Sequence, residues 1–97
     1  MLDKTYFVYI LASTRNGTLY IGVTSDLIKR IWQHENGLVK GFTQKYSVHT
    51  LVYYEQFDTS SEAIEREKYL KGKKRNFKIQ LIERMNSEWK DLYEEII

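Results

Sequence analysis

Hydrophobic and polar positions along the chain predict three strands and a set of short helices. β-Branched and aromatic residues dominate residues 5–11, 18–24 and 50–57, a composition typical of strands. The first two strands flank a polar loop that ends in Asn16-Gly17, which is a strong hairpin signal. Both of these strands are apolar on both faces, so we expect a sheet that is covered on each side.

Helix signals lie between and after the strands. We expect Ser25 or Asp26 to cap a helix that runs to about Asn36 and stops at Gly37, with residues 37–48 as a loop. Residues 59–62 fit a capping box, and a helix follows to about residue 71. Residues 77–85 and 87–96 are predicted as closing helices. Their expected buried side chains are Leu81, Met85, Trp89, Leu92 and Ile96. The order β-β-α-β-α-α predicts a small α/β (α+β) domain around a mainly antiparallel sheet.

Composition narrows the class of protein. The 97 residues suit one domain, and 42% hydrophobic with 29% charged residues is typical of an ordinary globular chain. The absence of cysteine excludes disulfides and thiolate metal sites. The longest uncharged apolar run, residues 6–13, is too short to cross a bilayer, and residues 1–4 lack the layout of a secretory signal. We therefore expect a cytoplasmic protein without a membrane partner.

The distribution of charge is more informative than the net charge of +2. Residues 66–78 carry a net charge of +6, and residues 79–97 carry −3. One interpretation of the basic segment is a solvated helix face. The other is a surface for nucleic-acid phosphates, with Lys71 and Lys74 as candidate contacts.

Glu67 stands where a helix is expected to face the core. At about 100° per residue it falls between the apolar residues Ala63, Ile64 and Leu70. A carboxylate there is costly unless it is paired or bound to a cation. Two interpretations are open: Glu67 pairs with a nearby Arg or Lys, or it points into a cleft and holds a hard metal ion.

Three further positions are candidates for a site. Gly22 interrupts a strand, so either a large side chain or a ligand phosphate approaches its backbone. Arg30 is either a side chain that covers the edge of the core or a guanidinium clamp on a phosphate. His34, four residues further on, is expected to be a surface residue.

Two tyrosine motifs resemble those of the GIY-YIG nuclease superfamily. Phe7-Val8-Tyr9 is followed after ten residues by Tyr20-Ile21-Gly22, and the similarity continues through Arg30, His34 and residues 63–68. Residues 78–89 resemble the small, single-domain bacterial branch of that superfamily. The resemblance covers essentially the whole chain, residues 1–97, and it implies a three-stranded antiparallel sheet flanked by helices.

The resemblance also implies a chemistry, the hydrolysis of phosphodiester bonds assisted by one divalent metal, Mg²⁺ or Mn²⁺. Tyr20 corresponds to the general base and Tyr9 to the first-motif tyrosine that lines the site. Arg30 corresponds to the arginine that stabilises the phosphate, and Glu67 to the single protein ligand of the metal. Supporting contacts to the substrate are expected from Gly22, Thr24, Lys29 and His34.

This chain departs from the family pattern in two places. Its first motif reads Phe-Val-Tyr, so only Tyr9 carries over from that motif. The late asparagine of family nucleases has Asn76 as its nearest counterpart, at a short spacing from Glu67. No room is left for a separate targeting domain, so specificity would come from the domain's own surface or from a protein partner.

Three functions remain open at this stage. The first is a metal-dependent endonuclease that acts on DNA. The second is a non-catalytic module that binds DNA or RNA through residues 66–78, with stacking on Phe42, Tyr46 or Trp32. The third is a protein-interaction domain that has lost the chemistry.

Overall fold

The computed structural model describes residues 4–97, so the first three residues, on which part of the signal-peptide argument rests, lie outside it. The expected order of elements is confirmed, with one short helix added in the segment predicted as a loop. The elements are β1 (Tyr6–Ala12), β2 (Leu19–Thr24), α1 (Leu27–Glu35), α2 (Phe42–Lys45), β3 (Thr50–Phe57), α3 (Ser60–Lys71), α4 (Arg75–Met85) and α5 (Tyr93–Ile96).

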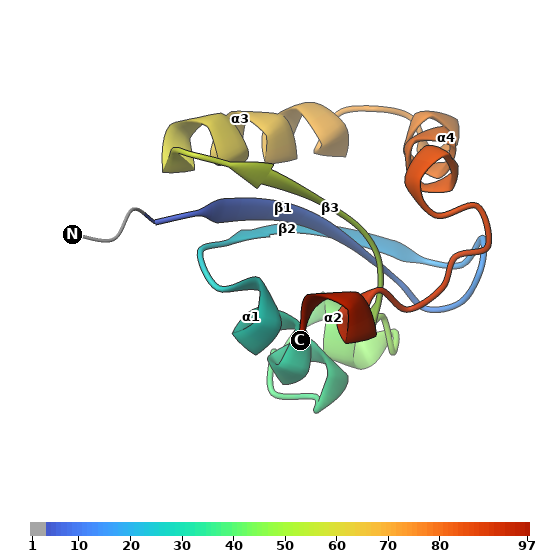
Figure 1. Ribbon diagram of the computed structural model, residues 1–97. Coiled ribbons are helices and arrows are strands. Elements are labelled where there is room, and N and C mark those ends of the chain that lie inside the picture. The colour runs from blue at the N-terminus through green and yellow to red at the C-terminus, as the bar shows by residue number, and fades with distance from the viewer. Residues whose placement is uncertain (1–3) are drawn as a thin grey trace.

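The three strands form one antiparallel sheet in the order β2-β1-β3. In Figure 1, α3 and α4 lie over one face of this sheet, whereas α1 and α2 lie over the other. The central strand β1 is therefore covered on both faces, as its apolar composition predicted. Strand β2 is an edge strand, and its free edge lies between the two layers of helices.

Alternation along the strands divides the core into two clusters. Val8, Ile10 and Ala12 of β1 pack with Ala63 and Leu70 under α3. Tyr9 and Leu11, which point to the opposite face, pack with residues of α1 and with Leu92 from the chain end. The sheet thus places Tyr9 and Tyr20 on the same side as α1.

Helix ends follow the predicted capping signals. The Asp26 carboxylate accepts a hydrogen bond from the Lys29 amide at 3.1 Å, and the Thr59 hydroxyl accepts one from the Glu62 amide at 3.2 Å. Gly37 follows α1 with a φ of 68°, a left-handed conformation that glycine adopts without strain. The polar side chains at these positions therefore set where α1 and α3 begin.

The predicted helix over residues 87–96 is wrong in its first half, because only Tyr93–Ile96 is helical. Asn86 turns the chain away from α4: its side-chain amide donates to the carbonyls of Val52 and Lys90. The Leu92 amide then donates to the Leu51 carbonyl at 2.8 Å, so this segment lies along β3. Met85, expected to be buried, is exposed as a consequence.

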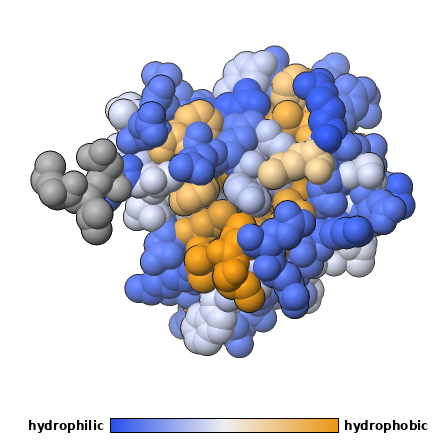
Figure 2. Space-filling view, in the orientation of Figure 1, coloured by the Kyte–Doolittle hydropathy of each residue, from blue (hydrophilic) through white to orange (hydrophobic). Residues whose placement is uncertain are grey.

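Hydrophobic surface gathers in Figure 2 where α1 and the C-terminal α5 come together, and hydrophilic surface surrounds it. A groove of about 360 Å³ in this region is lined in part by Phe7, Leu27, Ile28 and Ile96. Ile28 is an exposed hydrophobic side chain. Within residues 4–97, no helix combines the length and the hydrophobicity that crossing a membrane requires.

Candidate active site at the edge of the sheet

The two motif tyrosines lie side by side on neighbouring strands. Tyr9 is opposite Gly22 in the β1–β2 register, and Tyr20 is opposite Leu11, two positions along. Their ring centroids are 6.3 Å apart. A Cβ atom at Gly22 would lie 2.4 Å from the Tyr9 hydroxyl oxygen, so the phenol occupies the space that a side chain would need. Of the two interpretations of Gly22, the close approach of a large side chain is the one observed.

His34 is buried, which corrects the expectation of a surface residue. Its Nε2 lies 3.0 Å from the Tyr9 hydroxyl, and its Nδ1 lies 3.1 Å from the Thr43 hydroxyl. Burial, and after it the positive charge of Arg30, lower the pKa of His34 to about 4. The imidazole is therefore neutral at neutral pH and joins β1, α1 and α2 through hydrogen bonds.

The phenol of Tyr9 is held in its protonated form. Burial is the largest cause that raises its pKa, followed by Tyr20, and the charge of Glu67 acts in the same direction. The guanidinium of Arg30 opposes this rise. Tyr20, Arg30 and Glu67 are therefore all close enough to Tyr9 for their charges to act on it, although they come from three different elements.

Arg30 borders a small polar hollow of about 220 Å³ at the start of α1. Thr24 and Lys29, two of the four residues expected to contact the substrate, line the same hollow. The Thr24 hydroxyl accepts a hydrogen bond from the Asp26 amide at 3.0 Å. Thr24 thus shapes the turn that leads into α1, and Lys29 and Arg30 supply the positive charge of the hollow.

Glu67 projects from the inner side of α3 with its side chain 16% exposed. Its carboxylate lies 3.4 Å from the Lys71 ammonium, one helical turn later, so the interpretation of a paired carboxylate is confirmed. Ala63 and Leu70 on either side are buried as predicted, but Ile64 is exposed. The core-facing side of α3 is therefore centred on Ala63 and Leu70, and Glu67 lies beside it.

A partly buried ion pair beside Glu67 holds α3 on the sheet. The Arg66 guanidinium donates two hydrogen bonds of 2.8 Å to the two carboxylate oxygens of Glu55 on β3, and the Tyr53 hydroxyl donates to the same carboxylate. Burial acts to raise the pKa of Glu55, but the hydrogen bonds from Arg66 and Tyr53 outweigh it, so the pKa lies below its usual value. This clamp sets the rotation of α3 and with it the direction of the next residue, Glu67.

A second hollow, of about 330 Å³, opens beside Tyr20 at the free edge of β2. Both layers of helices contribute to it: Phe42 comes from α2, Lys71 from α3 and Lys78 from α4. Phe42 was predicted only as a stacking residue of a binding module, and Lys78 was not singled out within its segment. Lys78 belongs to the basic segment 66–78, which was the available signal, whereas Phe42 stood in a segment predicted as a loop. Lys74 is exposed at the N-cap of α4 and does not line this hollow.

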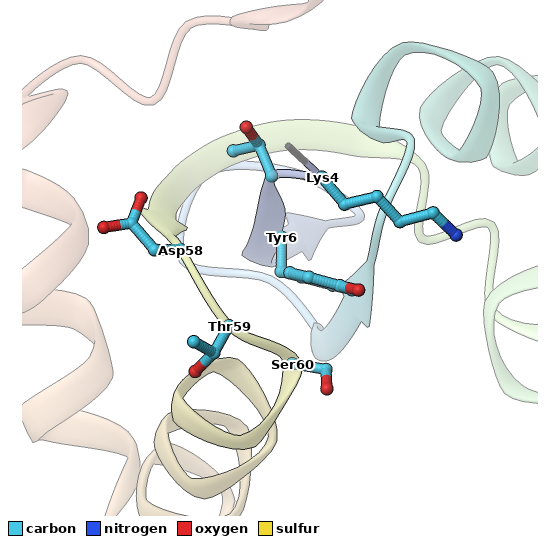
Figure 3. Close-up of a pocket in the computed structure, with 6 residues that line it drawn as sticks. Lys4, Tyr6, Asp58, Thr59 and Ser60 are labelled. Carbon is cyan, nitrogen blue, oxygen red and sulfur yellow. The ribbon is translucent and has the colours of Figure 1, made fainter. Parts of the chain in front are cut away.

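A larger hollow lies elsewhere on the domain. It measures about 600 Å³ and lies between the start of β1 and the turn into α3. Figure 3 shows Lys4 and Tyr6 on one side of it and Asp58, Thr59 and Ser60 on the other. Tyr6 begins β1, whereas Tyr20 is paired near the opposite end of that strand. This hollow is therefore separate from the tyrosine cluster.

The donor set near the tyrosines suits a hard, hydrated cation. In residues 4–97 no three His, Cys, Asp or Glu side chains are grouped as a metal cage. Mg²⁺ commonly takes one or two carboxylates and fills its remaining positions with water and substrate phosphate. One half-buried carboxylate, that of Glu67, fits that mode of binding, and its partner Lys71 lines the hollow beside Tyr20.

Comparison with known proteins adds independent information. The profile of the GIY-YIG catalytic domain matches residues 5–80. A UPF0213 protein of Staphylococcus saprophyticus is 42% identical over 81 residues, which are 84% of this chain and 96% of the relative. A UPF0213 protein of Clostridium perfringens is 43% identical over 76 residues, 78% of this chain and 81% of the relative.

A solved structure resembles the fold as well. The solution NMR structure of a UPF0213 protein from Bacillus halodurans matches with a TM-score of 0.56 and 29% sequence identity. The similarity covers 90% of this chain and 92% of that one. Sequence and structure comparisons therefore point to the same group of small bacterial proteins.

Proposed function

Because this chain belongs to the GIY-YIG family, we propose that it is a metal-dependent endonuclease that hydrolyses phosphodiester bonds in DNA. The single domain of residues 1–97 would carry the whole site. The observation that supports this proposal most directly is the placement of the Tyr9 and Tyr20 rings on neighbouring strands, with centroids 6.3 Å apart. The charges of Arg30 and Glu67 are near enough to act on the pKa of the Tyr9 phenol. In this proposal the tyrosine pair of β1 and β2, the guanidinium of Arg30 and the carboxylate of Glu67 would together supply the groups that such a reaction needs.

Tyr20 is the general base in this proposal. The buried Tyr9 hydroxyl shares a hydrogen bond with Nε2 of His34. It keeps its proton because burial raises its pKa. Tyr20 is half-buried and borders an open hollow, so a water molecule can reach its hydroxyl. Tyr9 and His34 would act as positioning residues that pack against the Tyr20 ring. The ring centroid of Tyr20 lies 6.3 Å from that of Tyr9 and 5.6 Å from that of His34.

Arg30 would stabilise the negative charge that builds on the phosphate. Its guanidinium borders a polar hollow with Lys29, and a planar fork of N–H donors matches phosphate oxygens. Preorganised positive charge of this kind lowers the barrier because it needs no rearrangement during the reaction. Arg30 also stands beside His34, whose neutral state it favours, so it meets no competing positive charge there.

Glu67 would hold the divalent ion, Mg²⁺ or Mn²⁺. When bound, such an ion supplies a Lewis acid that neutralises charge on the phosphate and the leaving oxygen. Lys71 lies 3.4 Å from the Glu67 carboxylate, and its 52% exposed side chain is free to move toward the substrate backbone. The Arg66–Glu55 clamp keeps the Glu67 carboxylate on the inner side of α3.

The test is plasmid nicking in magnesium with matched carboxylate variants. Glu67→Ala and Arg30→Ala should reduce nicking by at least about 100-fold, as expected for loss of one electrostatic stabiliser. Glu65→Ala, which removes an exposed carboxylate two residues along the same helix, should nick like the parent. A purified parent that nicks nothing, or Glu67→Ala and Arg30→Ala variants as active as the parent, would contradict the proposal.

A second candidate function is a nucleic-acid-binding module without cleavage. One observation favours it: Lys71 and Lys78 of segment 66–78 line the same hollow as Tyr20 and Phe42. Titration with labelled DNA and RNA at several salt concentrations separates the two functions. Salt-dependent binding without magnesium-dependent products would favour the module over the enzyme.

A further inference from the structure

Three aromatic rings form a continuous row that begins at Tyr20 and runs outward to the surface. Tyr20 and Phe42 are stacked, with ring centroids 6.2 Å apart and an angle of 27° between the planes. Phe42 and Tyr46 follow with centroids 4.9 Å apart. The two outer rings are 45% and 48% exposed, so the row ends on open aromatic surface.

Positive charge surrounds this row. The Lys45 ammonium lies 5.4 Å from the centroid of the Tyr46 ring. Lys71 and Lys78 line the hollow that Tyr20 and Phe42 share. Exposed rings with cationic side chains at their margins are the combination that single strands require, since the bases stack and the backbone carries negative charge.

The outer rings are held on a platform that is fixed to the tyrosine cluster. Both stand on the short α2 or at its C-cap, and the Thr43 hydroxyl between them contacts buried His34 at 3.1 Å. The Gln44 side chain donates to the Gly37 carbonyl at 2.9 Å, which ties α2 to the end of α1. The aromatic surface is therefore in place before any ligand arrives, which lowers the entropy cost of binding.

We propose that Phe42 and Tyr46 are a stacking surface for an unpaired nucleobase next to the phosphate that is cleaved. This inference rests on the proposed nuclease function and specifies its substrate class as unpaired strands, loops or flaps. The faces of bases inside a duplex are covered by their neighbours, so a duplex has no free face to place on these rings. The row of rings thus selects for nucleotides that are not paired in a duplex.

Binding of oligonucleotides that contain 2-aminopurine tests this proposal, with EDTA present so that no cleavage occurs. Stacking on an aromatic ring quenches the fluorescence of this base. We expect the parent to bind a single strand and quench it, and to bind a matched duplex at least about tenfold more weakly. Phe42→Leu keeps an apolar side chain but removes the aromatic face, so it should weaken single-strand binding about tenfold, and Phe42→Trp should restore it.

Tyr69→Ala is the matched control, because Tyr69 is also an exposed ring with a lysine, Lys73, 4.6 Å from its centroid. It should bind single strands like the parent. Thermal unfolding of each variant identifies any that fail to fold, and Tyr46→Leu provides a second, independent change at the outermost ring. Single-strand affinity unchanged in both Phe42→Leu and Tyr46→Leu would overturn the proposal, as would equal affinity for strand and duplex.

The outcome is distinguishable from failure of the nuclease proposal. If the parent quenches 2-aminopurine fluorescence in single strands through Phe42 but yields no magnesium-dependent products, the proposal of a stacking surface stands and the nuclease proposal fails. The same titration is made with DNA strands and with RNA strands. Loss of binding to either kind of strand in Phe42→Leu supports the proposal. The kind of strand that the parent binds more tightly identifies the preferred sugar.

Discussion

The Tyr9 hydroxyl lies 3.0 Å from Nε2 of His34, and both side chains are almost completely buried. The other ring nitrogen of His34 contacts Thr43, so a chain of three polar groups crosses the interior from β1 through α1 to α2. Within the described residues, no buried side-chain nitrogen or oxygen lacks a hydrogen-bond partner. Removal of any member of this chain leaves its neighbour unsatisfied.

Tyr9→Phe should therefore destabilise the fold, although it removes only one oxygen atom. The His34 Nε2 would lose its partner in a buried position, which costs about 1–3 kcal/mol of unfolding free energy. Chemical denaturation monitored by circular dichroism measures this change. Tyr46→Phe, at an exposed ring, is the control and should leave the unfolding midpoint where it is. Equal midpoints for Tyr9→Phe and the parent would contradict the buried contact.

The His34 ring should titrate far below an ordinary histidine. Its pKa is lowered to about 4 from 6.5, so the unfolded chain binds more protons than the folded one between these values. The contribution of His34 to stability is therefore fully present above about pH 6.5 and is lost as the pH falls toward 4. NMR of the imidazole protons measures the titration, and His34→Gln identifies the resonance. A midpoint near 6.5 would show that the ring is open to solvent.

Gly22→Ala should displace the Tyr9 ring. The new Cβ would lie 2.4 Å from the phenol oxygen, and the ring is enclosed in the core, so it has no free space to move into. Overpacking of this kind costs about 1–3 kcal/mol. Gly72→Ala is the matched control, since its Cβ would find no atom nearer than 3.6 Å. We expect thermal unfolding to separate the two variants clearly and nicking to be lost in the first alone.

Arg66→Met should loosen α3 from the sheet. It removes both hydrogen bonds to Glu55 and leaves that carboxylate with only the Tyr53 hydroxyl. Because the pair is only partly buried, we expect a loss of about 1–3 kcal/mol in unfolding free energy. Lys71→Met breaks a more exposed ion pair on the same helix and should cost about 0.5 kcal/mol or less. Similar losses in the two variants would argue against the clamp.

Glu35 should make the fold less stable at higher pH. Burial, and then the hydrogen bond and charge of Asp91, raise the pKa of Glu35 to about 7. A carboxyl with a raised pKa stabilises the fold fully below its unfolded value, and that contribution is lost as the pH rises through about 7. Water near the pair limits the effect to about 1 kcal/mol. Urea unfolding at pH 5 and pH 8 should show this loss in the parent and not in Glu35→Gln.

Local signals predicted most of the architecture because they act within a few residues. The strands follow runs of β-branched and aromatic side chains, and Thr59 and Asp26 begin their helices through their own side chains. The wrong prediction of a helix over residues 87–92 comes from a contact between distant segments. Residues 87–92 leave the helix because Asn86 bonds to Val52 on β3, 34 residues away in sequence.

The residues of the candidate site were proposed from the sequence, whereas their environment was not. Tyr9, Tyr20, Arg30 and Glu67 were named through a family resemblance, and their roles stay predictions. The burial of His34 could not be foreseen, because its polar partners come from β1 and α2.

Phe42 was named as a stacking candidate, but its contact with Tyr20 was missed for a related reason. A helix of four residues carries no periodic pattern, so the sequence offers no sign that α2 presents a ring to Tyr20.

The hollow beside Tyr20 has walls from both helical layers, with only the rim of one strand between them. A molecule bound there would contact helices on both faces of the sheet at once. Its binding energy would then oppose unfolding of the entire chain, and a rise in melting temperature would reveal a true ligand before its chemistry is known.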